Sequence, residues 1–144
     1  MFKKHSIAGR VSSGMIVGLV IGIVMMLILP IFGFQGVSPF SLGTLIMFFL
    51  MGALTGFIGI FSRHPVFDFK MSWWFSGPLV GVVFMTMYSL LTFDTLESFM
   101  QSSLFSQIGF HSPFWAILDG IWIGALMSYI EMKVAGKGEK LPAK

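Results

Sequence analysis

The sequence predicts an all-α integral membrane protein whose four transmembrane helices form two tandem hairpins of a parallel repeat. Three observations predict this fold. The chain contains four stretches of about 20 mostly apolar residues, which is the length needed to cross a bilayer. Only 10% of its 144 residues are charged, and short motifs occur twice in the same order. The alternative is a soluble helical protein, but a chain of this size could not hide so much apolar surface from water.

The four apolar stretches are expected to be helices, because lipid offers no partner to an unpaired backbone group. Strands of a membrane barrel would alternate apolar and polar residues, and these stretches do not. The expected spans run from about Ser13 to Phe32, Ser41 to Phe61, Trp73 to Leu91 and Pro113 to Ile130. The first span has a basic start, as a signal peptide does. Its length and the absence of an A-x-A site after it favour an uncleaved helix.

The basic residues lie before the first span, between the second and third, and after the fourth. They are Lys3, Lys4, Arg10, Arg63, Lys70, Lys133, Lys137, Lys140 and Lys144. The loops 31–40 and 92–112 contain none. Because positive residues favour the cytoplasmic side, both termini are expected in the cytoplasm, in a membrane of the bacterial inner (plasma) type. The net charge of +3 is therefore a topology signal, and no nucleic-acid partner is predicted.

Short motifs recur along the chain and indicate an internal duplication. SGMIVGLV at residues 13–20 resembles SGPLVGVV at residues 76–83. SPF occurs at residues 38–40 and again at 112–114, and GAL occurs at 52–54 and again at 124–126. The predicted repeats cover about 11–62 and 73–131 of a single membrane domain, 1–144, with a flexible basic tail at about 133–144. Each repeat holds two spans, so both enter the membrane in the same direction, as in parallel transporter repeats.

Glycines spaced four residues apart give every predicted span a ridge of small residues. They are Gly14, Gly18, Gly22, Gly52, Gly56, Gly77, Gly81, Gly120 and Gly124. Residues four apart share one helix face. In lipid, such ridges allow helices to approach closely. We expect helix-packing contacts at these positions; a glycine-lined pore or substrate path is the alternative.

The loops contain local helix signals. In both SPF copies, serine can cap a helix and proline suits its first turn. In the second outer loop, apolar residues at helical spacing predict a short interfacial helix over about Thr95–Ile108, with Asp94 as its cap and its apolar face in lipid. A docking surface for a partner is the alternative interpretation of that helix.

Asp119 is the one ionisable residue well inside a predicted span. Acidic residues within membranes face the protein interior or water and often mark ion or proton paths. Thr44, on the second span at a similar depth, is a candidate hydrogen-bond partner. The two residues together form a candidate polar site, and a purely structural role for Asp119 is the alternative.

Other chemistry is weakly represented in the sequence. The chain has no cysteine, which excludes disulfides, thiol catalysis and thiolate metal sites. His5, His64 and His111 lie apart from one another near the interfaces, a weak pattern for a metal site or for haem. No nucleophile–base motif and no phosphate-binding loop is visible. We therefore predict no enzyme activity, no cofactor and no metal.

These observations lead to two functional expectations. The first is a non-catalytic accessory or assembly subunit of a larger membrane complex, because the chain is small and every span has a contact ridge. Its partners would be the lipid bilayer and other membrane subunits, or a second copy of itself. The alternative is a small oligomeric channel or transporter for an ion or small solute, with Asp119 on the path.

Overall fold

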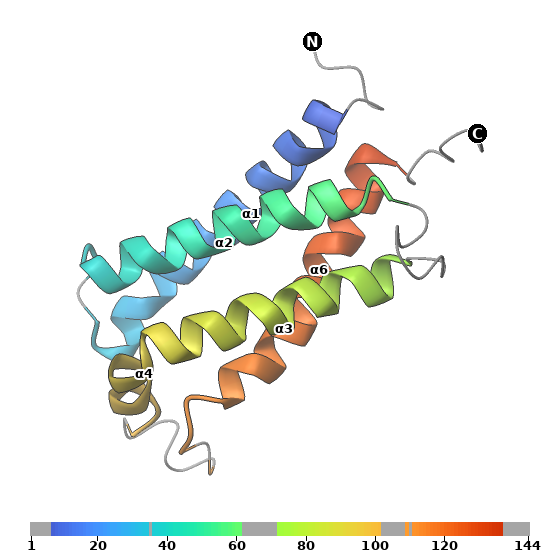
Figure 1. Ribbon diagram of the computed structural model, residues 1–144. Helices are drawn as coiled ribbons and strands as arrows, with labels where there is room; N and C mark the ends of the chain where they lie inside the picture. The colour runs from blue at the N-terminus through green and yellow to red at the C-terminus, as the bar shows by residue number, and fades with distance from the viewer. Residues whose placement is uncertain (1–6, 35, 62–71, 102–108, 110, 137–144) are drawn as a thin grey trace.

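The computed structural model describes residues 7–34, 36–61, 72–101, 109 and 111–136. It is all-helical over these residues, with no strand, which confirms the predicted fold class at that level. Its elements are α1 (Ile7–Ile28), the 3₁₀-helix η1 (Leu29–Phe32), α2 (Pro39–Ile58), α3 (Trp73–Leu91), α4 (Phe93–Met100) and α6 (Trp115–Ala135) (Figure 1).

Three helical segments are long and apolar enough to cross a membrane: α1 continued by η1, then α2, and α3. This is the composition of an integral membrane protein. The helix α6 has 21 residues. It is not one of these three, and it carries Asp119, Glu131 and Lys133.

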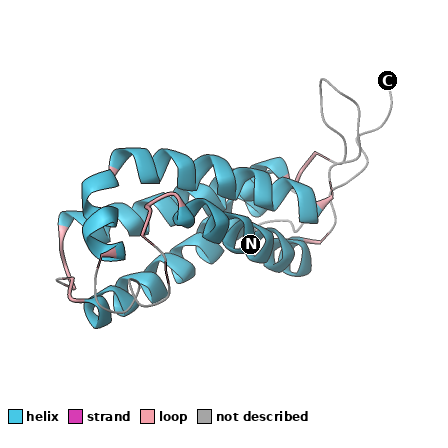
Figure 2. Cartoon of the chain, turned by 90° about the horizontal axis from the view of Figure 1, so that it is seen from below, coloured by secondary structure: helices cyan, strands magenta, loops and turns pink. Residues whose placement is uncertain are grey.

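The long helices pack in two pairs. The helix α1 packs chiefly against α2, and α3 packs chiefly against α6, while smaller contacts join α1 to α6 and α2 to α3. The start of α1, the end of α2, the start of α3 and the end of α6 lie at one end of the bundle, and α4 lies at the opposite end (Figure 1). A second view, from below, shows the same side-by-side arrangement of helices (Figure 2).

Two helix boundaries differ from the sequence prediction in an informative way. The helix α1 begins at Ile7 rather than near Ser13, and α6 continues to Ala135 rather than ending near Ile130. Each extension carries a buried charged residue, Arg10 in α1 and Glu131 in α6. The packed face of each helix therefore extends beyond the apolar stretch from which the span was predicted. By contrast, α3 has the bounds that hydropathy predicted.

The first SPF copy caps its helix as predicted. Ser38 and Ser41 form a reciprocal capping box at the start of α2, and Pro39 occupies the first turn. The second copy does not: α6 starts at Trp115 without a side-chain cap, and the hydroxyl of Ser112 accepts a 3.4 Å bond from the backbone N–H of Phe114.

The short helix predicted between the third and fourth spans exists as α4, but two details of its prediction were wrong. It starts at Phe93, so Asp94 lies in its first turn and does not cap it. Its apolar side is not free for lipid, because Leu96 and Met100 are buried. Residues 102–108, the rest of the predicted helix, lie outside the described residues.

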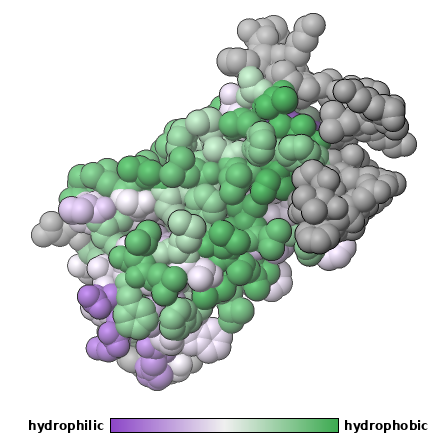
Figure 3. Space-filling view, in the orientation of Figure 1, coloured by the Kyte–Doolittle hydropathy of each residue, from purple (hydrophilic) through white to green (hydrophobic). Residues whose placement is uncertain are grey.

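The apolar side chains divide into a small core and a large outer surface. The core cluster contains Met47, Phe48, Met51, Val80, Met85 and Met127. Most leucines and isoleucines of the long helices point outward, and the hydrophobic colour covers the described length of the bundle, while hydrophilic residues gather at the end where α4 lies (Figure 3). Such a surface fits a lipid solvent, which removes the need to bury apolar side chains.

Candidate functional site

Asp119 and Thr44 occupy different environments. Thr44 is buried, and its hydroxyl donates a 2.8 Å bond to the carbonyl of Phe40 and is hydrogen-bonded to the hydroxyl of Tyr88. Asp119 lies on the exposed side of α6, and among the described residues its carboxylate has no hydrogen-bond partner. The predicted partnership between Thr44 and Asp119 is therefore replaced by a bond between Thr44 and Tyr88.

The Thr44–Tyr88 bond connects the two helix pairs. Thr44 belongs to α2 and Tyr88 to α3. The ring of Tyr88 also lies 5.9 Å from the ring of Phe40, so an aromatic contact accompanies the hydrogen bond. A hydrogen bond between two hydroxyls in an apolar setting orients the helices that carry them.

Asp119 belongs to a row of exposed residues that we name the Asp119 stripe: Leu118, Asp119, Trp122 and Leu126. These side chains follow one another at helical spacing on α6, and Trp122 is 77% exposed. The opposite side of the same helix is buried against α3 and carries the glycine ridge. A single carboxylate therefore stands in an outward apolar surface.

The glycine ridges are backbone contacts between helices. At each of the nine predicted glycines, a β-carbon would come within 3.2 Å of a backbone atom from the neighbouring helix. At Gly14 it would lie 2.1 Å from the carbonyl oxygen of Gly52, and at Gly52 it would lie 2.2 Å from that of Gly14. Only glycine fits such a crossing, because real atoms cannot approach that closely.

The second helix pair has contacts of the same kind. A β-carbon at Gly77 would lie 2.2 Å from the carbonyl oxygen of Gly124, and one at Gly124 would lie 2.1 Å from that of Gly77. One turn further along, a β-carbon at Gly81 would lie 1.8 Å from the carbonyl oxygen of Gly120. These ridges are filled by the facing helix backbone over their whole length.

A buried charged cluster, which the sequence analysis missed, lies at the opposite end of α6 from Asp119. Arg10 on α1 and Glu131 on α6 are only 8% and 6% exposed. The guanidinium of Arg10 donates a 2.6 Å bond to the carbonyl of Gly59, just after α2, and a second bond to the carbonyl of Gly136, just after α6. One side chain of α1 thus holds the ends of two other helices.

Glu131 is the acidic member of this pair, which we name the Arg10–Glu131 cluster. It attracts Arg10 electrostatically. Its Oε1 atom is buried and has no hydrogen-bond partner among the described residues. That atom lies against Gly14, where a β-carbon would come within 2.8 Å of it. The glycine therefore also makes room for the carboxylate.

Helix periodicity could have found both residues. Arg10 precedes Gly14 by four positions and so extends the ridge of α1 by one turn, and Glu131 follows Gly124 by seven, which is two turns. The sequence analysis assigned Arg10 to topology alone and ended the fourth span before Glu131. Arg10 was placed before the first span, and the structure places it within α1.

The histidines contribute no site in the part of the chain that the structure describes. His5 and His64 lie outside the described residues, and His111 is exposed. Within the described ranges, no three residues of the types His, Cys, Asp and Glu are grouped so that they could hold a metal ion.

Comparison of the chain with protein-family models, curated proteins and solved structures finds no match in any of the three. The geometry of the chain's own residues therefore carries the functional argument.

Proposed function

We propose that the chain is a non-catalytic accessory subunit of a larger membrane complex, and that the Asp119 stripe is its contact surface. The observation that carries the proposal is the exposure of Asp119 between Leu118 and Trp122 on an otherwise apolar helix side. A carboxylate facing lipid is costly, and intramembrane acids normally face protein or water. A helix of another subunit would cover it.

The chemistry of the stripe specifies the partner. The carboxylate needs a donor, and its charge is best matched by a lysine or arginine on the facing helix. The flanking Trp122 and Leu126 provide the apolar contact area around that polar pair. The expected partner is therefore a transmembrane helix with one basic residue at the depth of Asp119, about one turn below the start of α6.

The proposal rests on α6 being a fourth span. Its 21 residues correspond to about 31 Å of helix, close to the thickness of a bilayer core. The start of α1 and the end of α6 lie at the same end of the bundle, which supports termini on one side of the membrane. The basic residues near those ends favour the cytoplasm as that side. Reporter fusions after Lys144 and within 92–112 should report cytoplasm and exterior respectively, and the reverse pattern would overturn this orientation.

The glycine contacts also support the tandem parallel repeat. The pair Gly14–Gly52 in the first hairpin corresponds to Gly77–Gly124 in the second, under the alignment of SGMIVGLV with SGPLVGVV and of the two GAL motifs. Under the same alignment, the approach of Gly18 to Phe48 matches that of Gly81 to Gly120. Two hairpins with equivalent backbone crossings are the structure expected of a duplication.

The test of the subunit proposal is co-purification. The tagged chain, purified in mild detergent from its native membrane, should carry a stable partner that native mass spectrometry can identify. Asp119→Asn should weaken retention of that partner by about tenfold or more, since hydrogen bonds to charged groups are worth about 1.5–3 kcal/mol.

The matched control is Asp94→Asn, which removes an exposed carboxylate from α4 instead. It should leave partner retention unchanged. If Asp119→Asn and Asp94→Asn retain the partner equally well, the Asp119 stripe is not the contact surface. A partner without a basic residue near Asp119 would contradict the proposed chemistry.

An oligomeric channel or transporter with Asp119 on its path is the second candidate. The exposure of Asp119 favours a path between copies of the chain over one through a single bundle. A homo-oligomer without foreign subunits, together with ion flux in proteoliposomes that Asp119→Asn abolishes while the protein stays folded, would favour this candidate over the subunit.

A further inference from the structure

The core between the two hairpins is made mainly of methionine. Four of the six residues in the core cluster are methionines, contributed by α2, α3 and α6. Met51 and Met127 are fully buried, and Met47 and Met85 are 9% and 5% exposed. All four lie in the middle turns of their helices, so the cluster occupies the centre of the bundle.

Ordinary packing does not require this distribution. Methionine is a flexible gap-filler that specifies a core poorly, and leucine or isoleucine would fill the same space in better-defined rotamers. Among the described residues, however, most leucines and isoleucines are exposed and Leu96 alone of them is fully buried, while Ile21, Ile58 and Ile123 pack against the edge of the cluster. Met87 is the single methionine among the exposed large hydrophobic residues.

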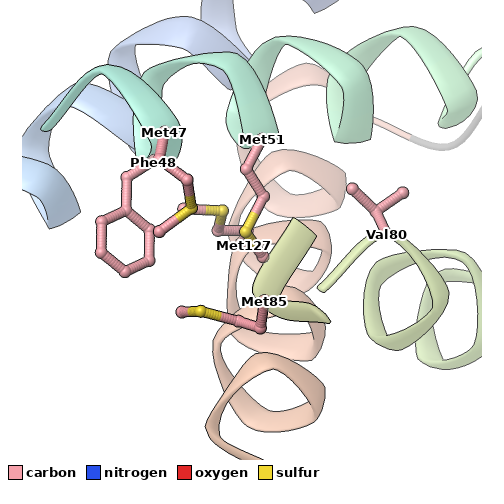
Figure 4. Close-up of a cluster of buried hydrophobic side chains, with 6 residues drawn as sticks. All are labelled: Met47, Phe48, Met51, Val80, Met85 and Met127. Atoms are coloured by element: carbon pink, nitrogen blue, oxygen red, sulfur yellow. The ribbon is translucent and has the colours of Figure 1, made fainter. Parts of the chain in front are cut away.

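Three of the thioether groups lie near one another in the core. Met47 and Met51 lie one turn apart on the same side of α2, and Met127 approaches from α6. In Figure 4 these three side chains point toward one another and their sulfur atoms gather between the helices, while Met85 enters from α3. Two thioethers at positions i and i+4 and a third from a facing helix could together supply three ligands to one ion.

We infer that this methionine cluster, Met47, Met51 and Met127, binds a soft monovalent metal ion, Cu(I) being the natural candidate. Thioether sulfur is a soft ligand that selects Cu(I) over the harder divalent ions. The three thioether ligands carry no charge. The full charge of the ion would therefore be buried without a counter-ion, which favours one positive charge over two.

The experiment is a titration of the purified full-length chain in detergent with Ag(I), a redox-stable probe for the same site, followed by Cu(I) under anaerobic conditions against a competing chelator. We expect one ion per chain and sulfur-only coordination by X-ray absorption. Zn(II) should not compete for the site.

The decisive variants are Met51→Leu and Met127→Leu, because this exchange conserves volume and is tolerated in cores. Each should lower the affinity for Ag(I) by about tenfold or more, as loss of groups around a metal commonly does. Met87→Leu, at an exposed position of α3, is the matched control and should bind as the unmodified chain does. Melting curves of the variants show that each remains folded.

Two results would overturn the inference. One is the absence of stoichiometric Ag(I) binding in the unmodified chain. The other is binding that Met51→Leu and Met127→Leu leave unchanged, which would place the ion elsewhere. If one leucine variant fails to fold, the other decides, and a chain in which both positions are leucine and which keeps its affinity would also reject the site.

Discussion

Replacing Gly81 with alanine tests whether backbone contact holds the second hairpin together. The added β-carbon would lie 1.8 Å from the carbonyl oxygen of Gly120 and 2.6 Å from its carbonyl carbon. Neither atom can turn away as a side chain could, so α3 and α6 must move apart by about 1.5 Å to restore an ordinary contact distance. Every other contact along that crossing would lengthen with them.

The expected cost follows from this separation. Overpacking of a close-fitting interior typically costs about 1–3 kcal/mol. The matched control is Gly43→Ala on α2, where a β-carbon would meet nothing within 4 Å. There, alanine should stabilise the helix by up to about 1 kcal/mol through its higher helix propensity.

The assay is unfolding of the purified chain by sodium dodecyl sulfate in mild-detergent micelles, followed by circular dichroism. Gly81→Ala should unfold at a lower fraction of the denaturing detergent than the unmodified chain, and Gly43→Ala at an equal or higher one. A midpoint for Gly81→Ala that equals that of Gly43→Ala would refute the view that backbone contact holds α3 to α6.

Further predictions concern polar groups inside the bundle. Arg10→Met should destabilise the chain by about 3–5 kcal/mol, because it leaves the buried charge of Glu131 unbalanced; Glu131→Gln should cost much less in the same assay, since Arg10 keeps its bonds to two carbonyls. Equal losses for both single variants would contradict this asymmetry. Tyr88→Phe should cost about 1 kcal/mol through loss of the bond to Thr44. Thr44→Val should cost little more once Tyr88 is already phenylalanine, and a strictly additive double-mutant cycle would show that the two hydroxyls do not interact.

Much of the fold was predictable because a helix that crosses lipid must be a long run of apolar residues, which is easily recognised in a sequence. Apolar runs of the right length predicted the helices, and the spacing of small residues predicted which faces could approach closely. The bounds of α3 agree, and the helix itself contains no charged residue. Those of α1 and α6 do not, since the predicted spans began after Arg10 and ended before Glu131, whereas the helices include both charged residues.

The candidate site was less predictable for the same reason. Arg10 and Glu131 form their cluster across 121 positions of sequence, and nothing local marks either as the other's partner. Thr44 was predicted to be a hydrogen-bond partner of Asp119 from its depth in the membrane alone. Which side chains meet also depends on the direction in which each one points around its helix axis. Hydropathy could not predict the methionine cluster, because a hydropathy scale does not distinguish a thioether from any other apolar group.

The bonds of Arg10 also have a consequence for biosynthesis. Arg10 leaves the ribosome early, whereas its acceptor at Gly136 is made 126 residues later. Membrane insertion proceeds from the N-terminus, so the guanidinium reaches the bilayer before its full set of acceptors exists, and lipid phosphates at the surface can hold it in the meantime. The bond that joins α1 to the end of α6 therefore forms only after Gly136 has been made. A chain truncated before Gly136 would lack this bond between Arg10 and the end of α6. The unpaired helix ends could then be recognised by proteases that degrade incompletely folded membrane proteins.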